Sequence, residues 1–111
     1  MRERKSRNLL CRYEVLVPLL FNDGVAVPET LVAETFTELR TRFGAASGET
    51  QVLHGVSEHK GVVYKDDLMR FVVDVSDTDE HLQFFKDFKE RLKKRFQQWD
   101  VWITSHPVEV I

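Results

Sequence analysis

The sequence predicts one α+β domain, in which a four-stranded antiparallel sheet carries two helices on one face. Three observations favour this fold class. Two stretches repeat apolar residues at the three- and four-residue spacing of an amphipathic helix. Four shorter stretches alternate or are rich in β-branched and aromatic residues, as strands are. The length of 111 residues suits a single hydrophobic core.

The first strand is expected at about residues 12–21, after a flexible basic leader over residues 1–10; residues 11–111 would form the domain. Its odd positions are apolar throughout: Tyr13, Val15, Val17, Leu19 and Phe21. Pro18 cannot donate a backbone hydrogen bond, so a central strand requires it to lie at a bulge or at an unpaired position. The turn-forming residues Asn22, Asp23 and Gly24 should end this strand.

The first helix is predicted to begin at Pro28, because a proline at the first helical position loses no hydrogen bond. Apolar residues then recur every three or four positions up to Gly44, which is expected to cap the helix. This apolar stripe comprises Val32, Phe36, Leu39 and Phe43.

Two strands are predicted next, near residues 50–56 and 68–75. The segment between them, residues 57–67, has two interpretations. It could extend the hairpin beyond the sheet as an arm that turns at Lys60-Gly61, or it could be an irregular loop. We favour the arm.

The second helix should begin near Asp79, capped by Ser76, Asp77 or Thr78, and end near Gln98. Its apolar stripe steps by three or four residues through His81, Phe85, Phe88, Leu92 and Phe96. The last strand is expected over residues 99–104, with Pro107 breaking the pattern.

The resulting order is strand, helix, strand, strand, helix, strand, which is the ferredoxin-like βαββαβ arrangement. Right-handed crossovers would place both helices on one face, with the first and third strands at the centre. In topology and patterning, though in no sequence motif, the chain resembles ferredoxin-like proteins of the dimeric α+β barrel type. This resemblance implies a homodimer in which two sheets meet face to face.

The second face of the sheet is predicted to have an apolar centre with a charged border. Its central residues are Leu16, Pro18, Leu20, Leu68, Val72 and Trp102. Such a surface is typical of an association site. A second subunit would cover it through Leu16, Leu20, Leu68, Val72 and Trp102. Alternatively, the C-terminal tail "HPVEVI" or the arm around Val62, Val63 and Tyr64 would fold back over it.

Arg70 is the leading candidate for a ligand-binding residue, because it lies mid-strand among the apolar side chains of this face. It could form an ion pair with Glu14, Asp74, Asp100 or a carboxylate of a second subunit. It could instead bind an anionic small molecule, with Trp102 stacking on the ligand and His54 as an acid or base.

The sequence therefore predicts a self-associating binding or assembly module. The alternative is a cofactor-independent enzyme of the dimeric α+β barrel type that acts on a small hydrophobic acid in a pocket on that face. No second group completes a mechanism, so the sequence leaves catalysis open and names no catalytic residue.

Several other classes are disfavoured. The formal net charge of −2 argues against nucleic acids and anionic membranes as partners. The apolar run from Val15 to Phe21 is too short to span a bilayer, and the single Cys11 favours the reducing cytoplasm. His54 and His59 are five residues apart, which does not fit a helical metal motif. We expect no metal and no cofactor.

Overall fold

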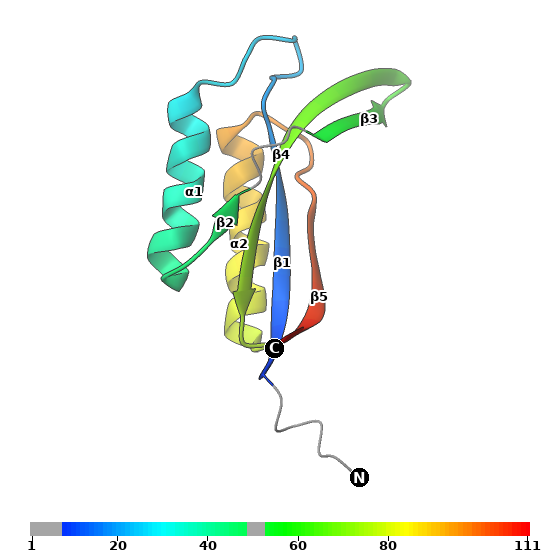
Figure 1. The fold of residues 1–111 in the computed structure, drawn as a ribbon. Helices are drawn as coiled ribbons and strands as arrows, with labels where there is room; N and C mark the ends of the chain where they lie inside the picture. Colours follow the sequence, from blue (N-terminus) through cyan, green and yellow to red (C-terminus); the bar gives the residue numbers. More distant parts are fainter. Residues whose placement is uncertain (1–7, 49–52) are drawn as a thin grey trace.

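The computed structural model describes residues 8–48 and 53–111; for residues 8, 53–57, 59 and 62–66 it describes the backbone alone. Along the chain the elements are β1 (Asn8–Pro18), α1 (Glu29–Phe43), β2 (Ser47–Gly48), β3 (Leu53–His59), β4 (Val62–Val75), α2 (Asp79–Arg95) and β5 (Ile103–Val110) (Figure 1).

All strands belong to one antiparallel sheet with the order β2-β4-β1-β5, and β3 also pairs with β4. β2 and β3 follow one another along the same edge of β4, with Ser47 opposite Val72 and Leu53 opposite Leu68. They therefore share one strand position, which leaves β1 and β4 at the centre. The predicted ferredoxin-like α+β fold is confirmed.

The hairpin of β3 and β4 continues past the rest of the sheet (Figure 1). Its pairing runs out to His59 and Val62, whereas β1 reaches β4 only as far as Leu68. Lys60 and Gly61 form the turn with φ of 52° and 80°, the positive values that a tight two-residue hairpin turn requires. The expected arm is confirmed.

The predicted bounds of the first and last strands were wrong. β1 begins at Asn8, so residues 8–10 belong to the sheet and not to the leader; residues 1–7 lie outside the described part of the chain. β5 covers Ile103–Val110 instead of residues 99–104, and it continues through Pro107.

The register explains both prolines. The Leu16 N–H donates to the Trp102 carbonyl directly opposite it at 3.0 Å. Hydrogen-bonded and non-hydrogen-bonded pairs alternate along an antiparallel ladder, so Cys11 and Pro107 form a non-hydrogen-bonded pair. The Pro107 nitrogen therefore faces the outer edge of the sheet. Similarly, Leu19 donates to Asp67 at 2.8 Å, so the Pro18 nitrogen faces away from β4. Neither proline removes a ladder bond there.

Gly44 and Thr78 cap the helices as the sequence suggests, whereas Pro28, expected at the first helical position, is the N-cap residue that precedes α1. Gly44 ends α1 with φ of 81°, a left-handed conformation that suits glycine. Of the three candidate caps of α2, Thr78 is the one used, because its hydroxyl accepts a hydrogen bond from the His81 N–H at 3.2 Å.

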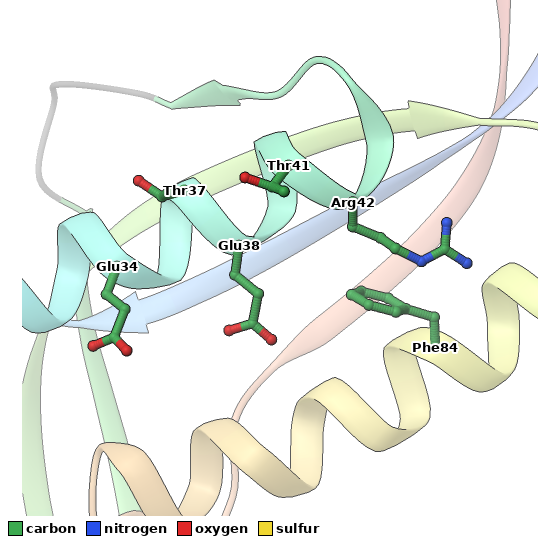
Figure 2. A pocket seen from close by; sticks show the side chains of 6 residues that line it. All are labelled: Glu34, Thr37, Glu38, Thr41, Arg42 and Phe84. Carbon is green, nitrogen blue, oxygen red and sulfur yellow. The ribbon is translucent and has the colours of Figure 1, made fainter.

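Charged side chains join α1 to α2. Figure 2 shows the α1 side of this contact, with Glu38 and Arg42 directed toward α2 and Arg42 beside Phe84. Glu38 of α1 accepts hydrogen bonds from Arg91 at 2.6 Å and from Arg95 at 2.9 Å. Two guanidinium groups lie over the Phe84 ring, that of Arg42 at 5.3 Å and that of Arg91 at 5.6 Å from the ring centroid. Although partial burial raises the pKa of Glu38, the two arginine hydrogen bonds outweigh it and hold this pKa below its usual value.

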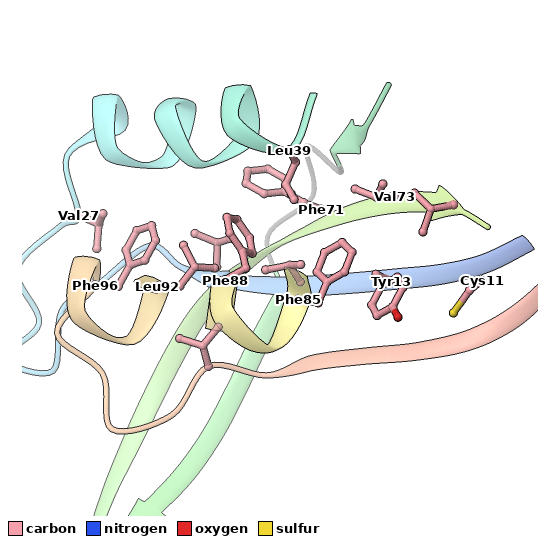
Figure 3. Close-up of a cluster of buried hydrophobic side chains, with 14 residues drawn as sticks. Cys11, Tyr13, Val27, Leu39, Phe71, Val73, Phe85, Phe88, Leu92 and Phe96 are labelled. Atoms are coloured by element: carbon pink, nitrogen blue, oxygen red, sulfur yellow. The ribbon is translucent and has the colours of Figure 1, made fainter. Parts of the chain in front are cut away.

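The core lies between the helices and the odd-numbered side chains of the strands (Figure 3). Val15, Val17 and Val73 are almost completely buried against residues such as Leu39, Phe88 and Leu92 of the helices. The Tyr13 ring stacks on Phe85 with a centroid distance of 3.9 Å, and burial raises the pKa of Tyr13 to about 12. The odd-numbered side chains of β1 and β4 therefore point to the helices, and the even-numbered side chains point to the other face.

Replacing Phe88 by Ala should lower the free energy of unfolding by about 3–5 kcal/mol, because Phe88 is fully buried and the truncation leaves a cavity. Leu82→Ala on the same helix is the control. Its side chain is 42% exposed, so it should cost under about 1 kcal/mol. Urea denaturation measures both values, and equal losses would contradict the assigned helix orientation.

Replacing Glu38 by Gln should destabilise the protein by about 1 kcal/mol near pH 7, where the carboxylate pairs with two arginines. Because the folded-state pKa of Glu38 is lowered, its contribution is present above the unfolded-state pKa of about 4.3 and is lost as pH falls through the folded-state pKa.

The deficit of the Glu38→Gln variant should therefore shrink in urea titrations at about pH 3. Glu34→Gln, one turn earlier on α1, is the matched control and should change stability by less than about 0.5 kcal/mol at either pH. A Glu38→Gln deficit that stays constant with pH would show that the ion pairs contribute nothing.

Candidate functional site

The face of the sheet opposite the helices is the candidate functional site. We call it the open face, and it consists of the even-numbered residues of β1, β4 and β5 together with Trp102. The register brings Glu14 opposite Val72, Leu16 opposite Arg70, and Pro18 opposite Leu68. Residues from strands far apart in the sequence thus share one surface.

The structure brings together most of the predicted association residues. Leu16 of β1 lies opposite Arg70, and Leu68 and Val72 lie on either side of Arg70 along β4; these three apolar residues are partly buried. Trp102 follows across β1, with its backbone carbonyl bonded to Leu16, and its side chain is 62% exposed. Leu20 lies past the end of β1, in an isolated bridge with Ala26, so the strand pairing does not place it with the others.

Arg70 forms an ion pair with Glu14, with the Arg70 Nε 3.3 Å from the Glu14 Oε1. Glu14 is one of the ion-pair partners that the sequence analysis proposed for Arg70. The second oxygen of Glu14 lies 3.7 Å from Nδ1 of His106, on β5. One carboxylate on β1 thus faces a cation on β4 and an imidazole on β5, across the full width of the open face.

A second ion pair, between Arg12 and Asp74, borders the apolar centre. Arg12 donates two hydrogen bonds to the carboxylate of Asp74, at 2.8 and 3.0 Å. This bidentate contact lowers the pKa of Asp74 and raises the pKa of Arg12. Sequence reasoning did not propose this pair, although both residues have the even parity of the open face.

The described side chains do not include that of His54, so its position relative to Arg70 and Trp102 is not described. The backbone of His54 lies in β3 opposite Asp67, and its side chain is outside the described part. Its predicted part in a site stays a prediction.

The alternative that the C-terminal tail "HPVEVI" folds back over the open face is wrong for residues 106–110. These residues belong to β5, which pairs with β1 as the outer strand of the sheet (Figure 1). The side chains of Val62, Val63 and Tyr64 are not described, so the arm is not tested as a cover.

The described part of the chain contains neither a metal-binding cluster nor a membrane-spanning helix. Among the side chains described, no three histidine, cysteine, aspartate or glutamate residues are grouped so that they could hold a metal ion. In residues 8–48 and 53–111, no helix combines the length and hydrophobicity that a bilayer crossing needs.

Comparison with known proteins supports the fold and no activity. No protein-family model matches this chain, and no curated protein matches it. Among solved structures, a phage SAM lyase in complex with S-methyl-5'-thioadenosine is similar with a TM-score of 0.62 and 14% identity, covering 91% of this chain and 90% of that one. A phage SAM lyase in the apo state is similar with a TM-score of 0.60 and 17% identity, covering 100% of this chain and 90% of that one.

The divalent cation tolerance protein Cut A1 from Thermus thermophilus gives a TM-score of 0.57 with 16% identity, covering 90% of this chain and 84% of that one. At such identities the likeness concerns the fold alone. It confirms the ferredoxin-like fold at the level of chain topology. The chain is thus a small α+β domain of this fold.

Proposed function

We propose that this chain is a self-associating binding or assembly module, and that the open face contacts the same face of a second copy to form a homodimer. The observation that carries the proposal is the apolar centre of Leu16, Leu68 and Val72 on the sheet face that the helices leave uncovered. An apolar centre with a charged border is how association surfaces are built.

The charges on this face favour a second copy over a partner of one charge sign. Arg12 and Arg70 are matched by Asp74 and Glu14, so the face carries both signs in equal number at these positions. A two-fold axis sets a surface against itself, which requires such self-complementarity. A polyanion or a polycation would meet like charges at half of these positions.

Trp102 adds contact area at the border of the face. Its side chain is 62% exposed although it is large and apolar. Tryptophan is among the residues that contribute most to binding in protein interfaces. Two copies that meet over the open face could bury about 1,600 Å² in total, which is the usual area of a specific interface.

A cofactor-independent enzyme acting on a small hydrophobic acid is the second candidate. One protein of similar fold, the phage SAM lyase, was solved with a bound small molecule. On the open face of this chain, however, an anionic ligand would compete with Glu14 for Arg70. Association is therefore the better-supported function.

The single cysteine, Cys11, is buried and unpaired, and it supports a cytoplasmic location.

Analytical ultracentrifugation tests the association. At about 10 µM, a concentration at which a standard-size interface is largely formed, the chain should sediment as a dimer. Val72→Lys should make it monomeric, because the new charge would be buried at the centre of the contact. Leu82→Lys, an exposed position on α2, is the control and should leave the dimer intact.

A wild-type monomer at this concentration would overturn the proposal, as would a Val72→Lys variant that is folded by circular dichroism and still dimeric. The enzyme alternative is tested by titrating small aromatic and aliphatic acids while intrinsic Trp fluorescence is followed. A saturable change that Arg70→Ala abolishes would favour the ligand pocket, and no change across the panel would favour assembly alone.

A further inference from the structure

We infer that a cavity between α1 and the sheet binds a small apolar molecule that carries a cationic group, such as an aromatic or aliphatic amine. The cavity has a volume of about 680 Å³. Its apolar wall includes Leu19, Ala26, Val32, Ala33 and Met69, and Glu29, an exposed residue in the first turn of α1, also lines it. It lies on the helix side of the sheet, so the inference is independent of self-association through the open face.

The cavity results from the sizes of the side chains along α1. Near the beginning of the helix, Val32 and Ala33 face Leu19 and Met69, and these small side chains leave space between the layers. About one turn later, Phe36 contacts the Phe71 ring edge to face at a centroid distance of 5.1 Å, and this aromatic pair fills the space.

Gly48 of β2 lines the cavity beside the aromatic pair. A Cβ atom at this position would lie 3.3 Å from the Phe71 ring and 3.4 Å from the Phe36 ring, so the glycine backbone rests directly on both. The cavity therefore has a packed aromatic end, which a flat ligand can contact.

The volume and the lining match a small-molecule site. Ligand pockets in proteins usually enclose about 300–1,000 Å³ and have mostly apolar walls with a few polar groups. Valine, leucine, alanine and methionine side chains form much of the wall, so an apolar molecule bound there removes apolar surface from water. The apolar part of the ligand should therefore supply most of the affinity.

Glu29 decides the charge of the ligand. It lies in the first turn of α1 and is the charged residue among the described residues that line the cavity. Its carboxylate attracts an ammonium group and repels a carboxylate. An amine thus fits this cavity, whereas a hydrophobic acid, the ligand expected for the open face, does not.

The two methionines of the chain provide a direct test. Met69 lines the cavity and Met1 lies at the chain terminus, so protein labelled with ¹³C at the methionine methyl groups carries one reporter inside the site. Titration with 2-naphthylmethylamine should shift the Met69 methyl signal saturably. 2-Naphthoic acid has the same rings and the opposite charge, and should bind about fivefold more weakly.

Glu29→Gln should remove the preference for the amine and bring the two dissociation constants to within about twofold of each other. Glu34→Gln is the matched control, because it makes the same charge change on α1 but lies in the groove between the helices and not in this cavity (Figure 2). It should retain the full preference. Ala33→Trp, which fills the cavity, should abolish the Met69 shift.

The inference is overturned if neither compound shifts the Met69 signal, or if a folded Ala33→Trp variant binds as well as the wild type. It is also overturned if the acid binds as tightly as the amine, or if Glu29→Gln and Glu34→Gln behave alike. Should Ala33→Trp fail to fold, the comparison of the two glutamine variants still decides the ligand charge. Sedimentation of the same variants separates this outcome from a failure of self-association.

Discussion

The burial of the odd-numbered side chains of β1 and β4 beneath the two helices is the constraint on which the rest of the structure depends. Val15, Val17 and Val73 have almost no exposed surface, and they pack against fully buried helix residues such as Phe88 and Leu92. Side chains alternate along a strand, so fixing one set in the core fixes the other set on the opposite face. A slip of one residue would exchange the two sets.

This alternation lets β4 serve two surfaces at once. Met69 and Phe71 point to the helix side, where they line the cavity under α1. Arg70 and Val72 point to the open face, where they meet β1 through Leu16 and Glu14. A ligand in the cavity and a second copy on the open face would contact different side chains of the same strand, so neither would exclude the other.

The charged groups help to specify the strand register and the contact between the two helices, which the apolar core alone would specify less strictly. Glu14 and Asp74 pair with Arg70 and Arg12 across the two central strands, and Glu38 pairs with arginines across the two helices. Each contact is partly exposed, so its effect on stability is modest. Each also selects one register or one helix contact over its neighbours, because a shift would separate opposite charges.

The sequence by itself determined the helices, their caps and the parity of the strands, because these follow from local spacing: Thr78 and Gly44 cap as expected, and Tyr13 and Phe71 point inward. Tertiary structure alone decided the path of β5, which continues through Pro107 because the nitrogen of this residue faces the outer edge of the sheet and removes no ladder bond. It also decided the pairing of Arg12 with Asp74, which are 62 residues apart, and the cavity under α1. Strand register, the edge position of a strand and the volume left between layers depend on how elements meet, so the periodicity of residues within one element does not predict them.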